Sequence, residues 1–525
     1  MRLSFHFQLY ENFVASRWFL DFPKIQILIP NLNFQSHSRW KNLITNSSSL
    51  MNRVEIFIRP SNIDTLLTEE VDIPHRNLMV HTHLVKNQEE LKDFETKLTK
   101  LVENFRDSAE FSEMVFFHSK FFFSFVAPLH NLTHLNLIAS QNQDLNSFDD
   151  TSPEVLLPKL RVLGLKSATC LLKHFKEHSL EVLKIIDVSS DKVNLNINEF
   201  LIKCDKLREI KFMGFIPHFD DIKSFKFQLS SVSILLKGQS ETGSESVLQL
   251  IKRHKDTLKD LKIIGFDTKD FIEFAINDMN LRKLEVDLTR IRADFGHLKI
   301  NKSIKRMMLQ TIALSMKQMQ KVIESCQGIE EFKIVSNSNL MFSNWLFKAA
   351  TSMDSLRVMY IDSLLGILLP QDLNFKNLEV LTVTKLGGDA QLLGWVQLVS
   401  RCPNVKKLIV TAWGQQFMPM CSLTKEKATE LTFLRKNNLQ FILISLPQLE
   451  EIEIRGEFPM TDEVVDALVA SHGYSKLRKF TFGSEMTEEL MKKLKRFHDT
   501  KVQCVVLKPS DIKRTIKRKS SESYR

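Results

Sequence analysis

The sequence is poor in the residues that make turns. Its 525 residues include only 15 glycines and 14 prolines, about half the share usual in globular proteins. A β-propeller or β-sandwich of this length needs more turn residues, so the composition favours a helix-rich modular chain. The chain is also longer than a single globular core usually grows, and we therefore expect several domains or a repeat array.

Cysteine and long apolar runs are scarce as well. Six cysteines are too few for a disulfide framework and indicate a reducing compartment, so we expect the protein in the cytoplasm, the nucleus or both. Polar residues interrupt the N-terminal segment, which predicts no signal peptide. The most apolar stretch, residues 114–129, contains His118 and Lys120 and is shorter than a bilayer span. We interpret it as a buried helix and expect no membrane partner.

Excess positive charge is missing from most of the chain. The net charge is +10, but residues 508–525 alone contain seven Lys or Arg against two Asp or Glu. A nearly balanced body argues against nucleic acid as a partner. We expect a disordered, solubilising tail; the alternative is a nuclear-localisation or polyanion-binding segment.

A hexapeptide, aliphatic-x-x-aliphatic-x-aliphatic, recurs from residue 132 to residue 482. Clear copies are LTHLNL at Leu132, LRVLGL at Leu160 and LKDLKI at Leu258, and the mean spacing is about 26.5 residues. That spacing is typical of leucine-rich repeats. In a short strand the second and third aliphatic side chains face inward and the residue between them faces outward. One such repeat cannot bury its apolar face alone, so neighbouring repeats must stack.

The segments between hexapeptides predict short helices. Residues 247–254, 319–325 and 395–401 are amphipathic and each precedes a hexapeptide. Three cysteines share the position three residues before the first aliphatic residue of a hexapeptide: Cys204, Cys326 and Cys402. Three prolines share the position two residues before it: Pro158, Pro403 and Pro447. We expect buried thiols and helix-stopping prolines. Zinc binding is disfavoured, because equal repeat positions lie at least one repeat apart.

Two irregularities interrupt the pattern. The interval from Val405 to Leu449 is 44 residues, which indicates either an insertion or a hidden degenerate copy. The position three residues after the last aliphatic, often Asn in such repeats, holds residues such as Ser140 and Ala168. An asparagine ladder is therefore largely missing, and its backbone hydrogen bonds must be made in another way.

The N-terminal segment resembles an F-box. Trp40, Leu43, Ile44 and Leu50 stand as in the second half of that motif, and Pro23, Ile25, Ile27 and Leu32 stand roughly as in the first. An F-box followed by such repeats is similar to F-box/leucine-rich-repeat proteins. This resemblance implies a three-helix hook that docks on a SKP adaptor, and through it a cullin, of a ubiquitin ligase. The implied adaptor-binding residues are Pro23, Ile25, Leu32, Trp40, Leu43 and Ile44.

The match departs from the family pattern in ways that point to a degenerate or truncated F-box. Lys24 follows Pro23, Pro30 interrupts an expected helix, and residues that normally precede the Trp are missing between Gln35 and Arg39. The alternative is a helix around Trp40 that caps the first repeat.

Together these observations predict an α/β leucine-rich-repeat solenoid. We expect a parallel sheet on its concave face, short helices on its convex face, and a small helical F-box-like segment. The expected divisions are 1–50 for that segment, 51–131 for first irregular repeats, 132–507 for the solenoid and 508–525 for the tail.

No motif predicts catalysis or a cofactor, since P-loop, GxSxG, HExxH and GxGxxG patterns are all missing from the sequence. Cys170, His174 and His178 could share one helix face, but no fourth metal ligand lies nearby in sequence. We interpret them as a solvated or half-packed face and predict neither an enzyme nor a metal site.

The outward strand positions are the predicted contact surface. A protein substrate, whose identity the sequence does not give, is expected on the concave face at Lys211, Lys262, Lys283, Arg306, Lys333 and Tyr360. Acidic residues interleave with these, so a mixed face is the default and a groove for an acidic peptide is the alternative. The expected role is substrate recognition for an SCF-type ligase, monomeric outside its complex; the alternative is a scaffold or inhibitor with no ubiquitin link.

Overall fold

The computed structural model describes the chain in segments. They are residues 25–27, 54–68, 77–81, 88–116, 125–139, 155–176, 179–186, 194–215, 218–236, 244–265, 268–289, 291, 294–311, 316–336, 353–363, 374–385, 398–411, 445–457, 462, 465–466, 476–483, 489, 492 and 503–507. The chain divides into two compact units, Met1–Ser231 with Thr242–Leu250 and Val232–Glu241 with Ile251–Arg525.

Unit 1 is a run of parallel strands joined by helices and turns. Its strands are β1 (Ile25–Ile27), β2 (Val54–Ile58), β3 (Asn77–His81), β4 (Phe111–Phe116), β5 (His134–Ala139), β6 (Val162–Lys166), β7 (Val182–Ile186) and β8 (Glu209–Met213). Each pairs in parallel with the next along the chain. The connections contain α4 (Ile63–Thr68), α5 (Gln88–Glu103), η4 (Thr169–His174), α7 (Asn194–Lys203) and η5 (Ile222–Ser224).

Unit 2 repeats this plan. Its strands are β9 (Ser231–Leu235), which begins at the boundary between the units, β10 (Asp260–Ile264), β11 (Lys283–Asp287), β12 (Arg306–Thr311), β13 (Glu331–Ser336), β14 (Val358–Ser363), β15 (Val380–Lys385), β16 (Lys407–Thr411), β17 (Glu451–Glu457), β18 (Lys479–Gly483) and β19 (Gln503–Leu507). Helices α9 (Lys269–Asp278) and α10 (Met316–Ser325) lie in its connections, and α8 (Ser244–Arg253) contains the boundary at Leu250.

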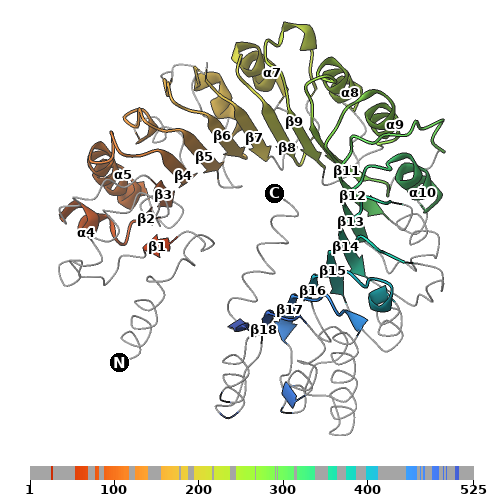
Figure 1. Cartoon of the computed structure of the whole chain (residues 1–525). Helices are drawn as coiled ribbons and strands as arrows, with labels where there is room; N and C mark the ends of the chain where they lie inside the picture. The colour runs from red at the N-terminus through yellow and green to blue at the C-terminus, as the bar shows by residue number, and fades with distance from the viewer. Residues whose placement is uncertain are drawn as a thin grey trace. The chain divides into compact units, whose positions relative to one another are not determined.

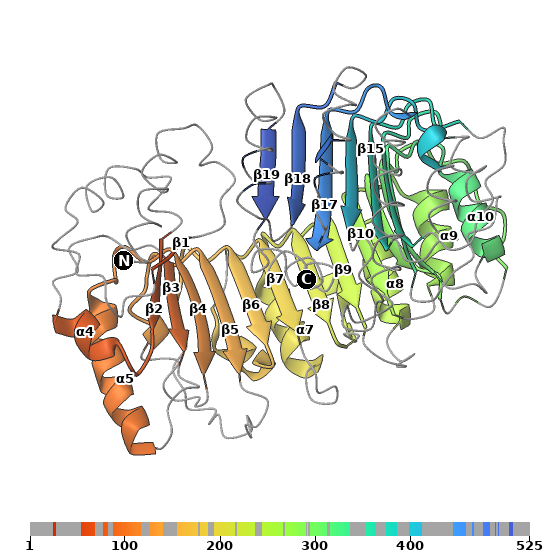
Figure 2. The same cartoon turned by 90° about the horizontal axis from the view of Figure 1, so that it is seen from below.

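The strands of each unit follow chain order and run in one direction (Figure 2). From β10 to β19 every neighbouring pair is parallel. Within each unit the helices lie on one side of the strands (Figure 1). The predicted α/β class with stacked parallel strands is thus confirmed, and this arrangement is compatible with a solenoid-like fold.

The hexapeptide determines which strand residues are buried. In the repeat that contains β10, Leu258, Leu261 and Ile263 are all buried, while Asp260 and Lys262 between them are half-buried. The same alternation appears in β5 and β7. The predicted inward positions are therefore confirmed, and the predicted outward positions are half-buried or exposed in these three strands but buried at Ser233 and Glu285. The amphipathic segments at 247–254 and 319–325 lie almost wholly in α8 and α10, as predicted.

The shared cysteine position is a packing site, as predicted. Cys204, Cys326 and Cys402 are all buried, and each backbone N–H donates to the carbonyl three residues earlier at 3.1 Å. Burial raises the pKa of the Cys326 thiol to about 12 and also raises that of Cys402. Both thiols are therefore protonated at neutral pH, as inert core residues are.

The long interval after Val405 places no strand between β16 and β17. β16 pairs directly with β17, with Lys407 opposite Glu451 and Leu408 opposite Ile452. The additional residues therefore add no strand to the ladder between these two.

The interpretation of residues 114–129 as one buried helix is wrong at its start. Met114 and the two residues after it belong to β4, which is paired on both sides. The cause is a disguised repeat in which Ala109, Ser112 and Met114 take the three inward positions. Serine at the middle position hides the hexapeptide, although its side chain is fully buried.

The helical expectation for residues 1–50 also needs one correction. Ile25 lies in β1, which pairs in parallel with β2 through Ile25 opposite Val54 and Ile27 opposite Ile56. Alternating β-branched residues suit a strand better than a helix. The other implied adaptor contacts, Pro23, Leu32, Trp40, Leu43 and Ile44, lie outside the described residues, as does the basic tail.

Candidate partner-binding face

The strand residues that point away from the core define a surface that we call the open face. It consists of the third and fifth residues of each hexapeptide. In β10 these are Asp260 and Lys262. These side chains are mostly half-buried or exposed, whereas their strand neighbours are fully buried. Five of the six predicted contact residues lie on β10 to β14 of unit 2, and Lys211 lies on β8 of unit 1.

Lys262 and Lys283 meet a shared carboxylate on the open face. Glu285 lies between them, with its oxygens 3.0 Å from the Lys262 ammonium and 2.6 Å from the Lys283 ammonium. Its side chain is buried, with 8% of the residue exposed. Burial by itself raises the pKa of Glu285, but the two ammonium groups outweigh burial and hold the pKa below its ordinary value. The carboxylate is therefore charged and neutralises much of the local positive charge.

The other predicted cations on this face are engaged too. The Arg306 guanidinium lies 3.4 Å from a Glu331 oxygen, and the Lys333 ammonium lies over the Tyr360 ring, 4.6 Å from its centroid. In unit 1, Lys211 pairs with Glu209 on its own strand at 2.5 Å. Four cations and three acids therefore share the outward positions of β10 to β14, namely Lys262, Lys283, Arg306, Lys333, Asp260, Glu285 and Glu331.

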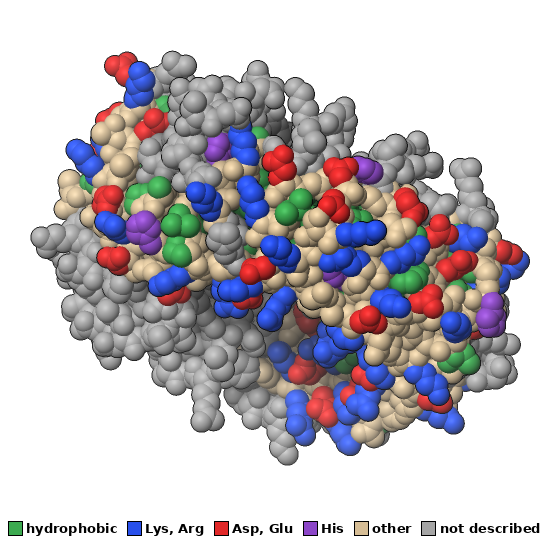
Figure 3. All heavy atoms as spheres, turned by 90° about the horizontal axis from the view of Figure 1, so that it is seen from above, with side chains coloured by type: hydrophobic (Ala, Val, Ile, Leu, Met, Phe, Trp, Pro, Cys, Tyr) green, Lys and Arg blue, Asp and Glu red, His purple; other side chains and the backbone are tan. Residues whose placement is uncertain are grey.

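This composition supports the predicted mixed face rather than a basic groove. Figure 3 draws the side that carries the helices rather than the open face, and acidic and basic side chains are interspersed there as well. An acidic peptide laid across β10 to β14 would have to displace carboxylates that already hold the cations. The structure thus disfavours the acidic-peptide alternative at these strand positions.

Next to the charged strands, the open face becomes apolar. Val358, Val380 and Ile409 occupy outward positions of β14, β15 and β16 and are half-buried, as is Tyr360; Thr382 lies between Tyr360 and Ile409 in the register. The register brings Val358 opposite Val380. Apolar side chains surrounded by charged pairs are the usual anatomy of a protein-binding surface.

A polar ladder runs along the edge where the strands begin. The donor of each bond is the side chain just before the first aliphatic residue of one repeat. The acceptor is a backbone carbonyl of the preceding repeat, two residues before the first aliphatic residue there. The bonds are Asn131 to Asp107 at 2.8 Å, Ser179 to Pro158 at 3.1 Å, Asn377 to Asp354 at 2.7 Å and Asn404 to Lys376 at 2.6 Å. This ladder links neighbouring repeats at the opposite end of the strands from the missing asparagine ladder.

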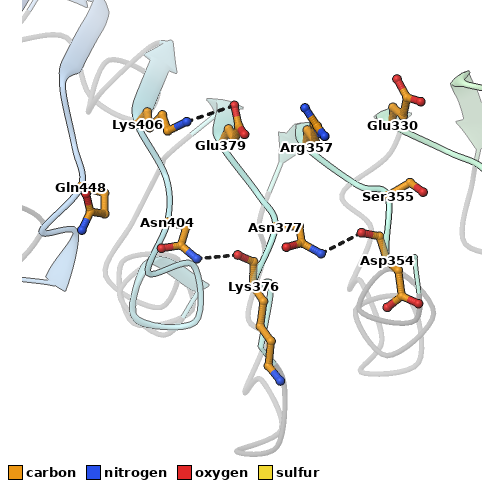
Figure 4. A pocket seen from close by; sticks show the side chains of 10 residues that line it. All are labelled: Glu330, Asp354, Ser355, Arg357, Lys376, Asn377, Glu379, Asn404, Lys406 and Gln448. Carbon is orange, nitrogen blue, oxygen red and sulfur yellow. Dashed lines mark hydrogen bonds and ion pairs between the residues drawn. The ribbon is translucent and has the colours of Figure 1, made fainter.

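Backbone bonds reinforce that edge. The carbonyl of the second hexapeptide residue accepts two N–H groups from the next repeat, as Glu379 does from Lys406 and Lys407 at 2.8 and 3.0 Å. An open cavity of about 510 Å³ lies here, with Glu379 and Lys406 paired at 3.5 Å (Figure 4). The residues that line this edge show no apolar periodicity, so the hexapeptide pattern did not predict them. The recurrence of Asn just before the first aliphatic was the signal that could have found them.

The candidate metal ligands do not form a site in the described part of the chain. His174 is buried in the 3-10 helix η4, Cys170 is half-buried, and His178 lies outside the described residues. A 3-10 helix repeats every three residues, so the spacing of four no longer places the side chains on one face. Among the described residues, no three His, Cys, Asp or Glu side chains are grouped as a metal ion requires, and no helix has the length and apolar character needed to cross a bilayer.

No family model matches the chain, and no curated protein sequence matches it.

Proposed function

We propose that this protein is a leucine-rich-repeat protein that acts by binding another protein on its open face, with no catalysis of its own. The observation that carries the proposal is the exposure of one face of a parallel sheet. Parallel sheets in α/β proteins are normally covered on both faces. Here alternate residues of β5, β7 and β10 stay half-buried or exposed while their neighbours are fully buried.

The chemistry of the open face suits a protein partner. Its apolar part around Tyr360 and Ile409 supplies area for hydrophobic contact, and the ion pairs on either side supply specificity. Lys407 and Glu451, paired at 2.7 Å, flank the apolar part on one side, and Arg306 with Glu331 flanks it on the other. A polyanion would gain little from cations that carboxylates already neutralise.

We further propose that the partner is a substrate presented to an SCF-type ubiquitin ligase. The support is the resemblance of residues 38–50 to the second half of an F-box, placed directly before the repeats. The proposed hook contacts are Trp40, Leu43 and Ile44, with Pro23 and Leu32 as further sequence-predicted contacts. Ile25 is left out because it belongs to β1.

The second candidate is a scaffold or inhibitor with no ligase link. It is favoured by β1, since a strand that continues the parallel ladder at the start of unit 1 fits a capping segment. A cap protects the first repeat and requires no adaptor.

Affinity purification of the tagged full-length protein from cells distinguishes the two. The parent is expected to retain a SKP adaptor and a substrate protein; W40A/L43A is expected to lose the adaptor and keep the substrate, because the two contacts are separate. Y360A/I409S should show the reverse loss. K223E/K226E, which changes exposed lysines of unit 1, serves as the control, and circular dichroism checks that each variant is folded.

Adaptor that is absent from the parent, or that remains bound to W40A/L43A, would remove the ligase assignment and leave the scaffold. Substrate that stays bound to folded Y360A/I409S would refute binding at the open face.

A further inference from the structure

A second pocket lies in unit 2, away from the open face. It has a volume of about 480 Å³ and is lined by the turns that lead into β10, β11 and β12. Four lysines line it, Lys255, Lys259, Lys299 and Lys302, against two acids, Asp256 and Asp278. The pocket therefore has an excess of positive charge, unlike the open face.

Most of these lysines have no acidic partner. Lys255 and Lys302 are exposed and form no ion pair with any carboxylate in the part of the chain that the structure describes. The Lys259 ammonium donates to the Asn280 carbonyl at 3.4 Å, while the Lys299 ammonium lies 3.7 Å from an Asp278 oxygen. The charge of at least three ammonium groups is thus available to a ligand.

An apolar residue stands in the same pocket. Ile300 is 63% exposed, more than Leu156 at 59% and Ile202 at 38%, the other large hydrophobic residues exposed in the described segments. Behind it Ile276 and Met279 are buried. A ligand that covers Ile300 would remove apolar area from water, which a purely anionic ligand cannot do.

The walls of the pocket are held in place by hydrogen bonds. Asn301 is buried, and its amide donates to the carbonyls of Ile276 at 2.9 Å and Met279 at 3.2 Å. Its side-chain oxygen accepts the Ser303 N–H at 2.9 Å, and the Asn277 side chain accepts the Lys299 N–H at 2.8 Å. A pocket formed in advance costs less ordering entropy on binding.

We propose that this pocket binds an acidic segment of the protein partner, with its carboxylates on Lys255, Lys259 and Lys302 and an adjacent aliphatic side chain on Ile300. The proposal rests on the proposed function and names the chemistry of the partner. A single-stranded nucleic acid fits less well, because no aromatic side chain lines the pocket for base stacking.

The test uses fluorescence anisotropy with the full-length protein and defined probes. The first probe is a labelled peptide, Ser-Glu-Asp-Glu-Leu-Asp-Glu-Ser; the second has Ser in place of Leu, and the third has Lys in place of each acid. The fourth is a labelled single-stranded oligouridylate. We expect the first peptide to bind, the second to bind about fivefold more weakly, and the third not to bind.

Charge reversal in the pocket gives the decisive comparison. K255E/K302E should weaken the first peptide by at least about tenfold. The matched control K223E/K226E makes the same change of charge at exposed lysines of unit 1 and should leave binding unchanged. I300S should weaken the first peptide but leave the Ser-containing peptide unaffected, and added salt should weaken both.

Equal weakening by both double variants would show attraction to overall charge and would overturn the proposal. So would tighter binding of the oligouridylate than of the peptide, or no peptide binding at all. The purification experiment separates the two claims: a substrate lost from Y360A/I409S but retained by folded K255E/K302E leaves the proposed function standing and removes the pocket.

Discussion

At the scale of single residues, the backbone just after the strand takes an unusual conformation in three repeats. Ser167, Gly214 and Gly265 all have positive φ, at 52°, 97° and 99°, and each is the eighth residue counted from the first aliphatic of its repeat. Gly265 also lies where a Cβ would be 2.5 Å from the Leu236 carbonyl oxygen. Both the conformation and the space therefore require glycine there.

We accordingly predict that G265A destabilises the protein by about 2 kcal/mol, since strained backbone and a backbone clash act together. Urea denaturation followed by circular dichroism measures the change. G296A is the matched control, because the nearest atom to its added Cβ is a Glu273 oxygen at 3.6 Å. A loss at G296A equal to that at G265A would contradict this explanation.

Single residues also explain what the sequence concealed. The repeat of β4 was missed because Ser112 occupies a position that the other copies give to an aliphatic residue, and Ser112 is fully buried all the same. A pattern of apolar and polar residue types in a sequence cannot show that a small polar residue is buried at a position that is usually aliphatic.

At the scale of elements, the pairing of β10 with β11 depends on charge as well as on backbone bonds. Register places Lys262 opposite Glu285, and Lys283 approaches the same carboxylate from its own strand. Removing the carboxylate leaves two ammonium groups close together on a half-buried surface. Removing one partner of a buried pair is costly even where the intact pair adds little.

We predict that E285Q lowers the free energy of unfolding by about 2 kcal/mol, because Lys283 is exposed enough to regain part of its hydration. Chemical denaturation near neutral pH tests this. The comparison is E331Q, whose pair with Arg306 is about half exposed on both sides and should change stability by about 0.5 kcal/mol or less. Equal losses would show that burial of Glu285 has no special effect.

Elements were predictable where their own side chains determine them. The hexapeptides identified the strands from β5 to β18 because burial of two alternate residues defines a strand. The short helices α8 and α10 followed from their apolar faces. The edge ladder of Asn131, Asn377 and Asn404 was not predictable in the same way, because it joins side chains to carbonyls of a different repeat. Only the stacking of repeats brings those atoms together.

At the scale of the whole molecule, charge distribution separates two kinds of surface. Predicted contact residues on the open face are paired with acids or with an aromatic ring, whereas the lysines around the pocket before β10 to β12 mostly are not. The open-face cations were predicted as contacts and the pocket lysines were not, because a sequence cannot show which carboxylate reaches which cation. The two proposed binding surfaces therefore differ in kind: the open face offers apolar area, and the pocket offers unpaired positive charge beside Ile300.

Stability of the molecule should also fall in mild acid, and the groups with shifted pKa values agree in sign. Burial lowers the pKa of the His254 imidazole to about 4, and the guanidinium of Arg253 adds to the shift. The unfolded chain therefore takes up this proton first as the pH falls. The contribution of His254 to the free energy of unfolding decreases from about pH 6.5 to about pH 4, by about 3 kcal/mol at most, and does not change further below that range. The lowered pKa values of Glu285 and Asp294 add further losses as the pH falls through them.

We predict that H254Q reduces the dependence of the unfolding temperature on pH between 6.5 and 4, because the variant has no imidazole to protonate in that window. Thermal unfolding followed by circular dichroism across this range measures the effect, with each variant compared to its own value at pH 7.5. H297Q is the control, since His297 is exposed. Its profile should follow that of the parent, and a profile of H254Q that also follows the parent would show that His254 is not the source of the acid sensitivity.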